Sequence, residues 1–541
     1  MRTKEQNMQL AEILFPDVKR TPKDIFKDFP ERKLKKGQMI LRFAPSPTGF
    51  LHIGSIYSGM ICVKFAKQTD GISILRIEDT DKEREIKDGV SMIVEGLKGF
   101  GIRFNEGVVS EDRSEGDYGP YMQSKRLDIY KVFTKDLVSK GLAYPCFLTE
   151  DELGEIREKQ SELSVRTGCY GKWAKWRDAS VEEIEQMLKQ EKKFAIRLYS
   201  EGNYENTFEM EDLTKGKVTV RENDMDAILL KSDGFPTYHF AHPIDDTLMG
   251  VTHITRGDEW FSSVALHVEL FNALGFKLLP YAHFSPLMKM DDGKKRKLSK
   301  RKDPESAVSY YIEKGYPKEG LLEYLLNIAN SNFYDWRIEN PTVSLDKFEL
   351  KFEKFNKSGA IFDIVKLDDV CKEYMATLSA EDVYSKALDW AREFDDEIFN
   401  LLEKNKDYCI NIFNIEREGE KVRKDLVKFE DVREQLVLFF DKLLENEKVE
   451  DISERVEVEA QKEIIKRYLE IFNINDSVDD WFGGIKKLAS DLNISKVGDV
   501  AMVLRVAITH RTRSPDLYQV IQVLGEEKVR GRLENYVATM L

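Results

Sequence analysis

Residues 39–55 read MILRFAPSPTGFLHIGS, and this stretch with its flanking elements decides the fold. The apolar residues at 39–44 predict a short buried strand, and a second strand is predicted for SILRI at 73–77. Between them, 55–68 is predicted to be a helix, because its apolar residues recur at helical spacing and Gly71 follows. Strand, loop, helix and strand in this order open a nucleotide-binding α/β unit.

The loop inside this stretch is suited to an anion. Pro45 and Pro47 stiffen it, and Gly49 and Gly54 let the backbone approach a ligand. His52 stands where the following helix starts, and free amides at a helix N-terminus favour phosphate oxygens. The alternative is an ordinary strand-to-helix loop with an incidental histidine, which the tripeptide HIG alone does not exclude.

The string FAPSPTGFLHIG at 43–54 resembles the HIGH signature of class I aminoacyl-tRNA synthetases, in the form found in glutamyl- and glutaminyl-tRNA synthetases. The resemblance implies that His52 is catalytic and that ATP contacts Ser46, His52, Gly54 and Ser55. The fourth signature residue is usually His or Asn. Ser55 stands there instead, and its hydroxyl can still bond a phosphate or cap the helix.

Three further segments carry charges and aromatic rings suited to a dicarboxylic amino acid: RIEDTD at 76–81, DGFPTYHFA at 233–241 and RGDEW at 256–260. Glutamate brings two carboxylates and one ammonium, and burying them requires opposite charges in the pocket. Guanidinium groups suit carboxylates because their planar forks donate two parallel hydrogen bonds. In isolation, the acidic run would also fit a solvated strand end, and the aromatic residues would fit an ordinary core.

By resemblance, Glu78 holds the substrate ammonium. Arg42 and Tyr238 read the side-chain carboxylate, and Arg256 binds the carboxylates from the other side; which arginine takes which carboxylate stays open. His242 stands at a variable family position and receives no role. The remaining contacts that the resemblance implies are with glutamate at Ala44 and Ser46, and with ATP at Glu259, Trp260 and Met288.

The segment KKRKLSKRK at 294–302 has seven basic residues among nine. As an anonymous run it would fit a solvated face. Its centre, KLSKR, resembles the KMSKS loop of the same family, which implies that Lys297 and Lys300 are catalytic and bind the ATP phosphates. With Mg²⁺, their ammonium groups stabilise charge on the α-phosphate and the leaving pyrophosphate. Contacts of Lys294 and Arg296 with the tRNA backbone are a hypothesis.

Cysteine usage argues against a disulfide framework and against a zinc site. The five cysteines are odd in number, far apart and without a CxxC pair. Many bacterial members of the resembling family carry zinc in an inserted module, but here Leu148 stands where a CxC pair needs its second cysteine. Cys146 and Cys169 alone cannot close a tetrahedral site. We therefore expect ATP with Mg²⁺ and no zinc or other protein-bound metal.

The chain after about residue 305 is mostly helix-patterned and rich in Lys and Glu. The segments MVLRVAIT at 502–509 and SPDLYQVIQVLGEEKV at 514–529 resemble the last helices of bacterial glutamyl-tRNA synthetases, which read the anticodon with an all-helical cage. The predicted helices are 319–330, 379–405, 428–447, 457–472, 480–492 and 515–540.

The expected fold class is α/β: a Rossmann-type parallel-sheet catalytic domain with an α+β insertion, followed by an all-α anticodon-binding region. The strand-like AILL at 227–230 is expected in the second half of the parallel sheet. The expected domains are an N-terminal extension outside the catalytic core at 1–38, the first Rossmann half at 39–145, an inserted acceptor-stem-binding module at 146–225, the second Rossmann half at 226–285, a KMSKS-type loop and stem-contact domain at 286–375, and a helical anticodon-binding domain at 376–541.

The resemblance implies a bacterial-type enzyme that joins L-glutamate to tRNA-Glu, and to tRNA-Gln in some cases, through a glutamyl-adenylate. The competing hypotheses are a glutaminyl enzyme, a non-catalytic tRNA-binding protein and a nucleotidyltransferase that makes another adenylate. The net charge of −14 does not exclude nucleic acid, because binding a phosphate backbone needs only a local basic stripe. Without an apolar run long enough to span a membrane and without a signal-type N-terminus, we expect a cytoplasmic protein. We also expect it to act as a monomer.

Overall fold

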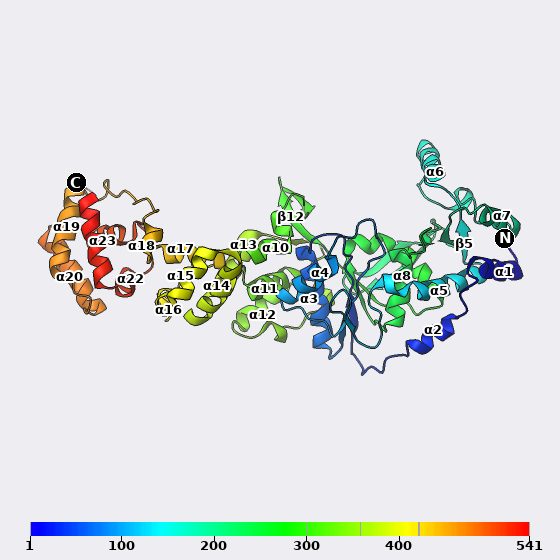
Figure 1. The fold of residues 1–541 in the computed structure, drawn as a ribbon, viewed down its shortest axis with the longest axis horizontal. Coiled ribbons are helices and arrows are strands. Elements are labelled where there is room, and N and C mark those ends of the chain that lie inside the picture. The colour runs from blue at the N-terminus through cyan, green and yellow to red at the C-terminus, as the bar shows by residue number, and fades with distance from the viewer. Residues whose placement is uncertain (1, 300, 358, 420–421, 540–541) are drawn as a thin grey trace. The chain divides into compact units, whose positions relative to one another are not determined.

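A computed structural model describes residues 2–299, 301–357, 359–419 and 422–539. The chain divides into two compact units. The first comprises residues 1–310 and 322–363, and the second comprises residues 311–321 and 364–541. Figure 1 shows the sheets and the surrounding helices of the first unit and the helices of the second. Within the described ranges, no helix is long and apolar enough to cross a membrane.

A parallel sheet forms the centre of the first unit. The pairs β1–β2, β2–β3 and β10–β11 are parallel. The backbone N–H of Thr252 donates to the Ile40 carbonyl at 2.9 Å, so β10 lies beside β1. The resulting order, β3-β2-β1-β10-β11, is that of a doubly wound α/β fold, in which ligands bind where the strand order reverses. The strands are β1 (Ile40–Phe43), β2 (Ile72–Leu75), β3 (Glu106–Val108), β10 (Ile254–Gly257) and β11 (Tyr281–Phe284).

The helix predicted for 55–68 is confirmed and starts two residues earlier, as α3 (Ile53–Gln68). Its buried residues include Ile56 and Met60. The α/β fold class is likewise confirmed, since parallel strands alternate with helices along the chain. The other elements around this sheet are α4 (Gly89–Gly99), β4 (Ser114–Glu115), η1 (Gln123–Arg126), α5 (Leu127–Ser139), α8 (Tyr238–Leu248), η3 (Asp258–Ser263) and α9 (Val264–Leu274).

The inserted module has its own small sheet, which corrects one prediction. The strand expected at 227–230 is β9 (Ile228–Leu230), but it pairs antiparallel with β6 (Ala195–Leu198) and not with the parallel sheet. A short apolar run indicates that a strand is covered, but it does not name the partner strand. The other elements are β5 (Ala143–Cys146), α6 (Glu150–Glu162), η2 (Gly171–Trp173), α7 (Val181–Lys189) and the hairpin β7 (Thr207–Asp212) and β8 (Gly216–Arg221).

The N-terminal extension is part of the first unit's core, contrary to the prediction that it lies outside. It folds as α1 (Lys4–Leu14) and α2 (Pro22–Asp28). Leu10 and Ile25 are buried in one cluster with residues of α5, α8 and α9. Arg32 binds Glu106, at the start of the strand β3 that pairs with β2, through two hydrogen bonds of 2.7 Å. The sequence alone did not show this, because the apolar residues of the extension are few and form no repeated stripe.

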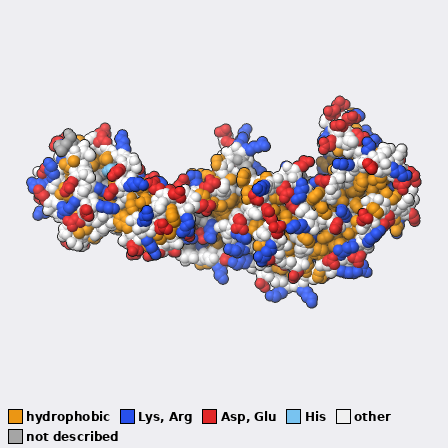
Figure 2. Space-filling model, in the orientation of Figure 1, with side chains coloured by type: hydrophobic (Ala, Val, Ile, Leu, Met, Phe, Trp, Pro, Cys, Tyr) orange, Lys and Arg blue, Asp and Glu red, His pale blue; other side chains and the backbone are white. Residues whose placement is uncertain are grey.

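The basic run 294–302 begins as a strand. β12 (Leu287–Asp291) and β13 (Lys294–Lys297) form an antiparallel hairpin in which Met288 is opposite Lys297. Figure 2 shows both basic and acidic side chains at the tip of this projecting hairpin. The elements that follow are η4 (Pro304–Ser306), α10 (Val308–Glu313), α11 (Lys318–Ala329), α12 (Phe333–Glu339), η5 (Leu345–Lys347), η6 (Phe352–Lys354) and β14 (Ala360–Ile361).

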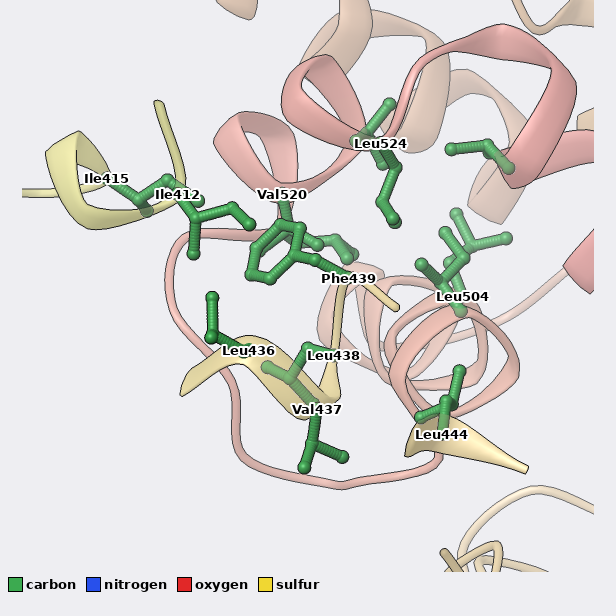
Figure 3. Packing of buried hydrophobic residues seen from close by; sticks show 14 of the residues in the cluster. Ile412, Ile415, Leu436, Val437, Leu438, Phe439, Leu444, Leu504, Val520 and Leu524 are labelled. Atoms are coloured by element: carbon green, nitrogen blue, oxygen red, sulfur yellow. The ribbon is translucent and has the colours of Figure 1, made fainter. Parts of the chain in front are cut away.

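The described part of residues 364–541 is built from helices around one core. Figure 3 shows Phe439 beside Val520, with Ile412 on one side and Leu504 on the other. The prediction of helical structure is confirmed here, and no strand occurs among these described residues. The helices are α13 (Ile364–Ala376), α14 (Ala380–Phe394), α15 (Asp396–Lys404), α16 (Lys406–Asn414), η7 (Phe429–Asp431), α17 (Val432–Val437), α18 (Asp441–Leu444), α19 (Val458–Ile471), α20 (Val478–Asp491), α21 (Val497–Thr509), α22 (Leu517–Leu524) and α23 (Glu526–Thr539).

Candidate functional site

A cleft of about 570 Å³ lies in the first unit at the carboxyl ends of β1 and β10. Most residues that the sequence predicts for ATP and glutamate line it together. Met288 does not line it, and Lys300 lies outside the described residues. The predicted residues that line the cleft are Arg42, Ala44, Ser46, His52, Gly54, Ser55, Glu78, Tyr238, Arg256, Glu259, Trp260 and Lys297.

The start of α3 borders this cleft. His52 is the N-cap residue, and its Nδ1 accepts a hydrogen bond from the Gly54 N–H at 2.9 Å. A neutral ring that accepts at Nδ1 carries its proton on Nε2, where it is a donor. A Cβ at Gly54 would lie 3.1 Å from Nδ1, so glycine makes room for this cap. The Ser55 N–H donates to the His52 carbonyl at 2.7 Å, so an anion in the cleft would meet the imidazole and the positive end of the helix dipole.

Arg256 lies in the cleft wall without a carboxylate partner among the described residues. Its Nε donates to His283 Nε2 at 2.9 Å, and its Nη1 lies 2.9 Å from His267 Nδ1. The same Nη1 is 3.4 Å from the Tyr238 hydroxyl. All of these partners are uncharged when the imidazoles are neutral. A buried guanidinium held only by neutral groups favours the binding of an anion beside it.

The histidines around Arg256 are neutral and have defined tautomers. Because Arg256 can only donate, His267 Nδ1 must accept, and its Nε2–H then donates to His239 Nδ1 at 3.0 Å. His283 Nδ1–H donates to Asp212 Oδ2 at 2.6 Å, while its Nε2 accepts from Arg256. Burial lowers the pKa of His267 and of His283. The imidazoles thus orient the guanidinium without repelling its charge.

Arg42, by contrast, is already paired. Its Nε donates to both oxygens of Asp246 at 3.0 and 2.9 Å. Arg76 Nη1 donates to Asp246 Oδ1 at 2.6 Å, and Arg76 Nη2 to Glu78 Oε1 at 3.3 Å. His242 Nδ1 lies 2.8 Å from Asp246, and burial lowers the pKa of His242 to about 3. Asp245 lies 3.9 Å from Arg76 Nε and pairs with Arg126 at 2.7 Å. Arg42 therefore belongs to a buried network of guanidinium groups and carboxylates.

Glu78 is the carboxylate of this network that faces the cleft. Burial raises its pKa to about 7, against the opposing effect of Arg76 and Arg42. Such a group changes its charge near neutral pH. When ionised it can hold an ammonium ion, and an ammonium ion bound there would lower its pKa in turn.

Aromatic and charged side chains also line the cleft. The rings of Tyr238 and Trp260 lie 4.2 Å apart between centroids. Lys297 Nζ lies 3.3 Å from Glu259 Oε1, and both side chains are about half exposed. A Cβ at Gly257 would meet the Glu259 carboxylate at 2.2 Å, so glycine leaves room for that side chain. Lys297 and Glu259 therefore form an ion pair at the exposed edge of the cleft. Each of them could leave this pair to bind a charged group of a ligand.

Comparisons with known proteins agree with this geometry. The description "tRNA synthetases class I (E and Q), catalytic domain" matches residues 38–369, and "Anticodon binding domain" matches residues 383–537. A glutamate–tRNA ligase from Clostridium perfringens (strain SM101) is 45% identical over 98% of this chain and 99% of its own length.

The chain belongs to the class I tRNA synthetases, among the glutamate–tRNA ligases. The glutamate–tRNA ligase from Sorangium cellulosum is 41% identical over 97% of this synthetase and 100% of its own length. A solved glutamate tRNA ligase from Elizabethkingia meningosepticum, in complex with its amino acid, has a TM-score of 0.77 at 26% identity. The match covers 93% of this synthetase and 100% of the solved chain. The anticodon-domain match lies in the helical region, as the sequence predicts for the bacterial type.

The basic hairpin of this synthetase is less free than its sequence suggests. Arg296 donates from Nε to Asp291, and from Nη1 and Nη2 to Asp303 at 2.6 and 2.7 Å. Contacting a tRNA phosphate would require breaking these ion pairs, so Arg296 is a poor candidate for such a contact. Lys294 is exposed and remains a candidate.

Sequence reasoning missed the residues that orient the site of this synthetase. The residues concerned belong to none of the segments that the sequence analysis singles out: Asp212, Asp246, His267 and His283. Their contacts join residues up to 204 positions apart, as between Arg42 and Asp246. The one available signal was a buried polar residue on a predicted strand or helix. This signal does not indicate which residue the polar side chain contacts.

Within the described ranges, no group of three or more His, Cys, Asp or Glu is arranged to hold a metal ion. Cys146 and Cys169 are both buried and unbridged. Nearby, the Tyr144 hydroxyl donates to Asp226 Oδ2 at 2.7 Å, and Arg197 donates to the Asp226 carbonyl at 2.9 Å. The interior of the inserted module therefore contains polar side chains that are joined by hydrogen bonds.

Proposed function

We propose that this chain activates L-glutamate with ATP and transfers it to tRNA-Glu through a glutamyl-adenylate. The observation that carries the proposal is the position of Arg256. Its unpaired charge shares one cleft with the carboxylate of Glu78 and with the amino end of α3. An amino acid with two carboxylates and one ammonium complements these groups, and the helix end complements the phosphates of ATP.

In the proposed complex, Glu78 holds the substrate ammonium. Arg256 binds a carboxylate directly, whereas Arg42, with Tyr238, binds the other as part of a pair with Asp246. Ala44 and Ser46, which line the same side, complete the amino-acid pocket. The protein mainly fixes positions and charges, which is how enzymes with two bound reactants lower the barrier.

The first reaction is attack of the glutamate α-carboxylate oxygen on the α-phosphorus of ATP. The bond between that phosphorus and the bridging oxygen breaks, and pyrophosphate leaves. His52 Nε2–H and the Ser55 hydroxyl donate to the phosphates at the amino end of α3. Lys297 and Lys300 stabilise the charge on the leaving group, while Trp260 and Glu259 line the nucleoside side.

In the second reaction a ribose hydroxyl of the terminal adenosine of tRNA attacks the carbonyl carbon of the adenylate. The ester forms, AMP leaves, and the hydroxyl proton is lost. ATP enters with Mg²⁺, which in such sites is held mostly by phosphate oxygens and waters. The cleft fits that mode, because Glu78 and Glu259 are the predicted site carboxylates that line it.

The proposal also includes the roles of individual domains, the location of the protein, its oligomeric state and its metal content. An acceptor-stem module at 146–225 and an anticodon region at 376–541 are part of it. So are a cytoplasmic location, action as a monomer and the absence of bound zinc. Charging of tRNA-Gln stays open, because residues that would exclude one anticodon have not been identified.

A glutaminyl enzyme is the nearest competing hypothesis. Glutamine brings one carboxylate where glutamate brings two, so either Arg256 or Arg42 would face an uncharged amide in the cleft, which disfavours glutamine. A non-catalytic tRNA-binding protein would have no need for His52, Glu78, Arg256 and Lys297 around one cleft.

The test is a charging assay with purified tRNA-Glu and tRNA-Gln and with labelled glutamate or glutamine. The proposal predicts a glutamyl ester on tRNA-Glu that is stable in acid and cleaved by mild alkali, and no glutaminyl ester on either tRNA. Glutamyl ester on tRNA-Gln would widen the substrate range without changing the site. Formation of glutaminyl-tRNA, or of no ester with intact protein, would contradict the proposal.

A further inference from the structure

One buried carboxylate ties together the base of the turn that follows β13. Asp303 is 1% exposed. Its oxygens accept from both Nη atoms of Arg296 at 2.6 and 2.7 Å. Oδ2 also accepts the backbone N–H of Ser299 at 2.9 Å, and Lys289 Nζ lies 3.3 Å from Oδ1. A single side chain therefore joins strand β12, strand β13 and the turn.

The same turn borders the ATP end of the cleft. Lys297, Leu298 and Ser299 line the cleft, and Lys300 follows them in the chain. Leu298 is 2% exposed, and its N–H donates to the Leu287 carbonyl at 3.0 Å. The N–H of Asp303 donates in turn to the Ser299 carbonyl at 3.0 Å. The turn is thus fixed at Leu298 by packing and at Ser299 by Asp303.

The charges of this cluster explain why a carboxylate is needed. Arg296 and Lys289 are cations on neighbouring strands, and Asp303 lies between them. Arg296 lowers the pKa of Asp303, so the group is ionised at neutral pH. An ionised, hydrogen-bonded side chain held by a bidentate guanidinium has little rotational freedom. It therefore fixes the backbone N–H of Ser299 in one place.

We propose that Asp303 is a positioning residue for the ATP-phosphate-binding turn, acting through Arg296 and the Ser299 N–H without touching the substrate. This inference rests on the proposed function, because it assigns the turn to ATP. It also separates the basic residues of 294–302 into two kinds. Arg296 serves the architecture of the turn, whereas Lys297 faces the cleft.

The test compares Asp303→Asn with Asp291→Asn. Asp291 is the other carboxylate bound to Arg296, but its side chain is 45% exposed, and no backbone N–H among the described residues of the turn donates to it. ATP–pyrophosphate exchange with glutamate and tRNA gives kcat and KM for each substrate. Asp303→Asn should lower kcat/KM for ATP on the order of 10²-fold, because small displacements of a charge-stabilising group have effects of that size. The KM for glutamate should change by less than about 2-fold, and Asp291→Asn should resemble wild type.

A second variant and a binding measurement separate positioning from folding. Arg296→Gln removes the same contact from the other side and should reproduce the ATP-specific loss, while Asp303→Glu, which restores the charge, should recover part of it. Thermal unfolding and tRNA binding should be unchanged in a variant that is only mispositioned. Equal losses toward ATP and glutamate, or wild-type ATP kinetics in Asp303→Asn, would overturn the inference.

The failure of the proposed function has a different signature. If wild type catalysed no glutamate-dependent exchange, the assignment of the reaction would fail. Binding of a fluorescent ATP analogue would then still test the role of Asp303. Weaker binding in Asp303→Asn than in Asp291→Asn would support it, and equal binding would reject it.

Discussion

At the scale of single residues, the charge of Arg256 distinguishes this cleft from an ordinary nucleotide pocket. Replacing Arg256 by Lys keeps the charge but removes the fork that binds His283 and His267. We predict that Arg256→Lys raises the KM for glutamate about 10- to 100-fold, the range that loss of a charge-assisted hydrogen bond gives. The KM for ATP should stay within about 2-fold. Equal changes in both KM values would contradict a role specific to glutamate.

The pKa of Glu78 gives a pH dependence with a definite sign. Burial raises this pKa to about 7, so below that pH much of the group is a neutral acid in the free enzyme. A neutral acid does not attract an ammonium ion, and the KM for glutamate should therefore fall as pH rises through about 7. Steady-state kinetics across this range measure it. Glu78→Gln should bind glutamate weakly at every pH, and a variant that kept the wild-type pH profile would exclude Glu78 as its source.

The residues that line the cleft were more predictable from the sequence than the residues that hold them in place. Arg42, Glu78 and Tyr238 belong to short motifs, so family resemblance located them, and the structure brings them together. Asp212 and His283 belong to no such motif. They meet because strand β7 pairs with β11 at Asp212 and Tyr281, a contact that no local sequence pattern encodes.

At the scale of elements, the N-terminal helix α1 adds to the core of the first unit. Leu10 is fully buried, whereas Met8 on the same helix is 54% exposed. We predict that Leu10→Ala lowers the free energy of unfolding of the first unit by about 2–5 kcal/mol, the usual cost of this change in a core. Urea denaturation of the full chain measures it. Met8→Ala is the matched control and should change the stability little. Equal effects of the two substitutions would show that α1 is not part of the core.

Helix boundaries were predicted less well than helix content, for identifiable reasons. The segment 379–405 is two helices because Asp395 ends α14 and caps α15 by accepting the N–H of Ile398 at 3.1 Å. The segment 515–540 is also interrupted, at Gly525 with a φ of 81°. Apolar spacing continues across both breaks, so periodicity alone does not reveal them. A capping aspartate and a glycine were visible in the sequence as possible breaks.

At the scale of the whole molecule, a net charge of −14 coexists with the proposed binding of an acidic RNA. Local cations then determine the salt dependence of binding. Lys294 is exposed, whereas Arg296 is held by Asp291 and Asp303. We predict that Lys294→Gln lowers the slope of log affinity for tRNA against log salt by about 1, while Arg296→Gln leaves it unchanged. Filter binding at several salt concentrations measures this, and an unchanged slope for Lys294→Gln would remove that residue from the tRNA contacts.

The division of the chain into an α/β unit and a helical unit was predictable from composition and motif spacing. The sequence turns to helix-patterned segments after the basic run, and the structure places only helices among the described residues of 364–541. The pairing of β9 with β6 was not predictable in this way. Helical periodicity is a local property, whereas strand pairing depends on residues far along the chain.

The central claim is that one cleft neutralises a dicarboxylic amino acid beside ATP. Its most direct test is ATP–pyrophosphate exchange by the wild-type protein, in the presence of tRNA-Glu, with glutamate or glutamine as the only amino acid. We predict rapid exchange with glutamate and, with glutamine, a kcat/KM lower by about 10²-fold or more, because glutamine offers the two arginines of the cleft one carboxylate instead of two. Equal exchange with the two amino acids, or faster exchange with glutamine, would contradict the account.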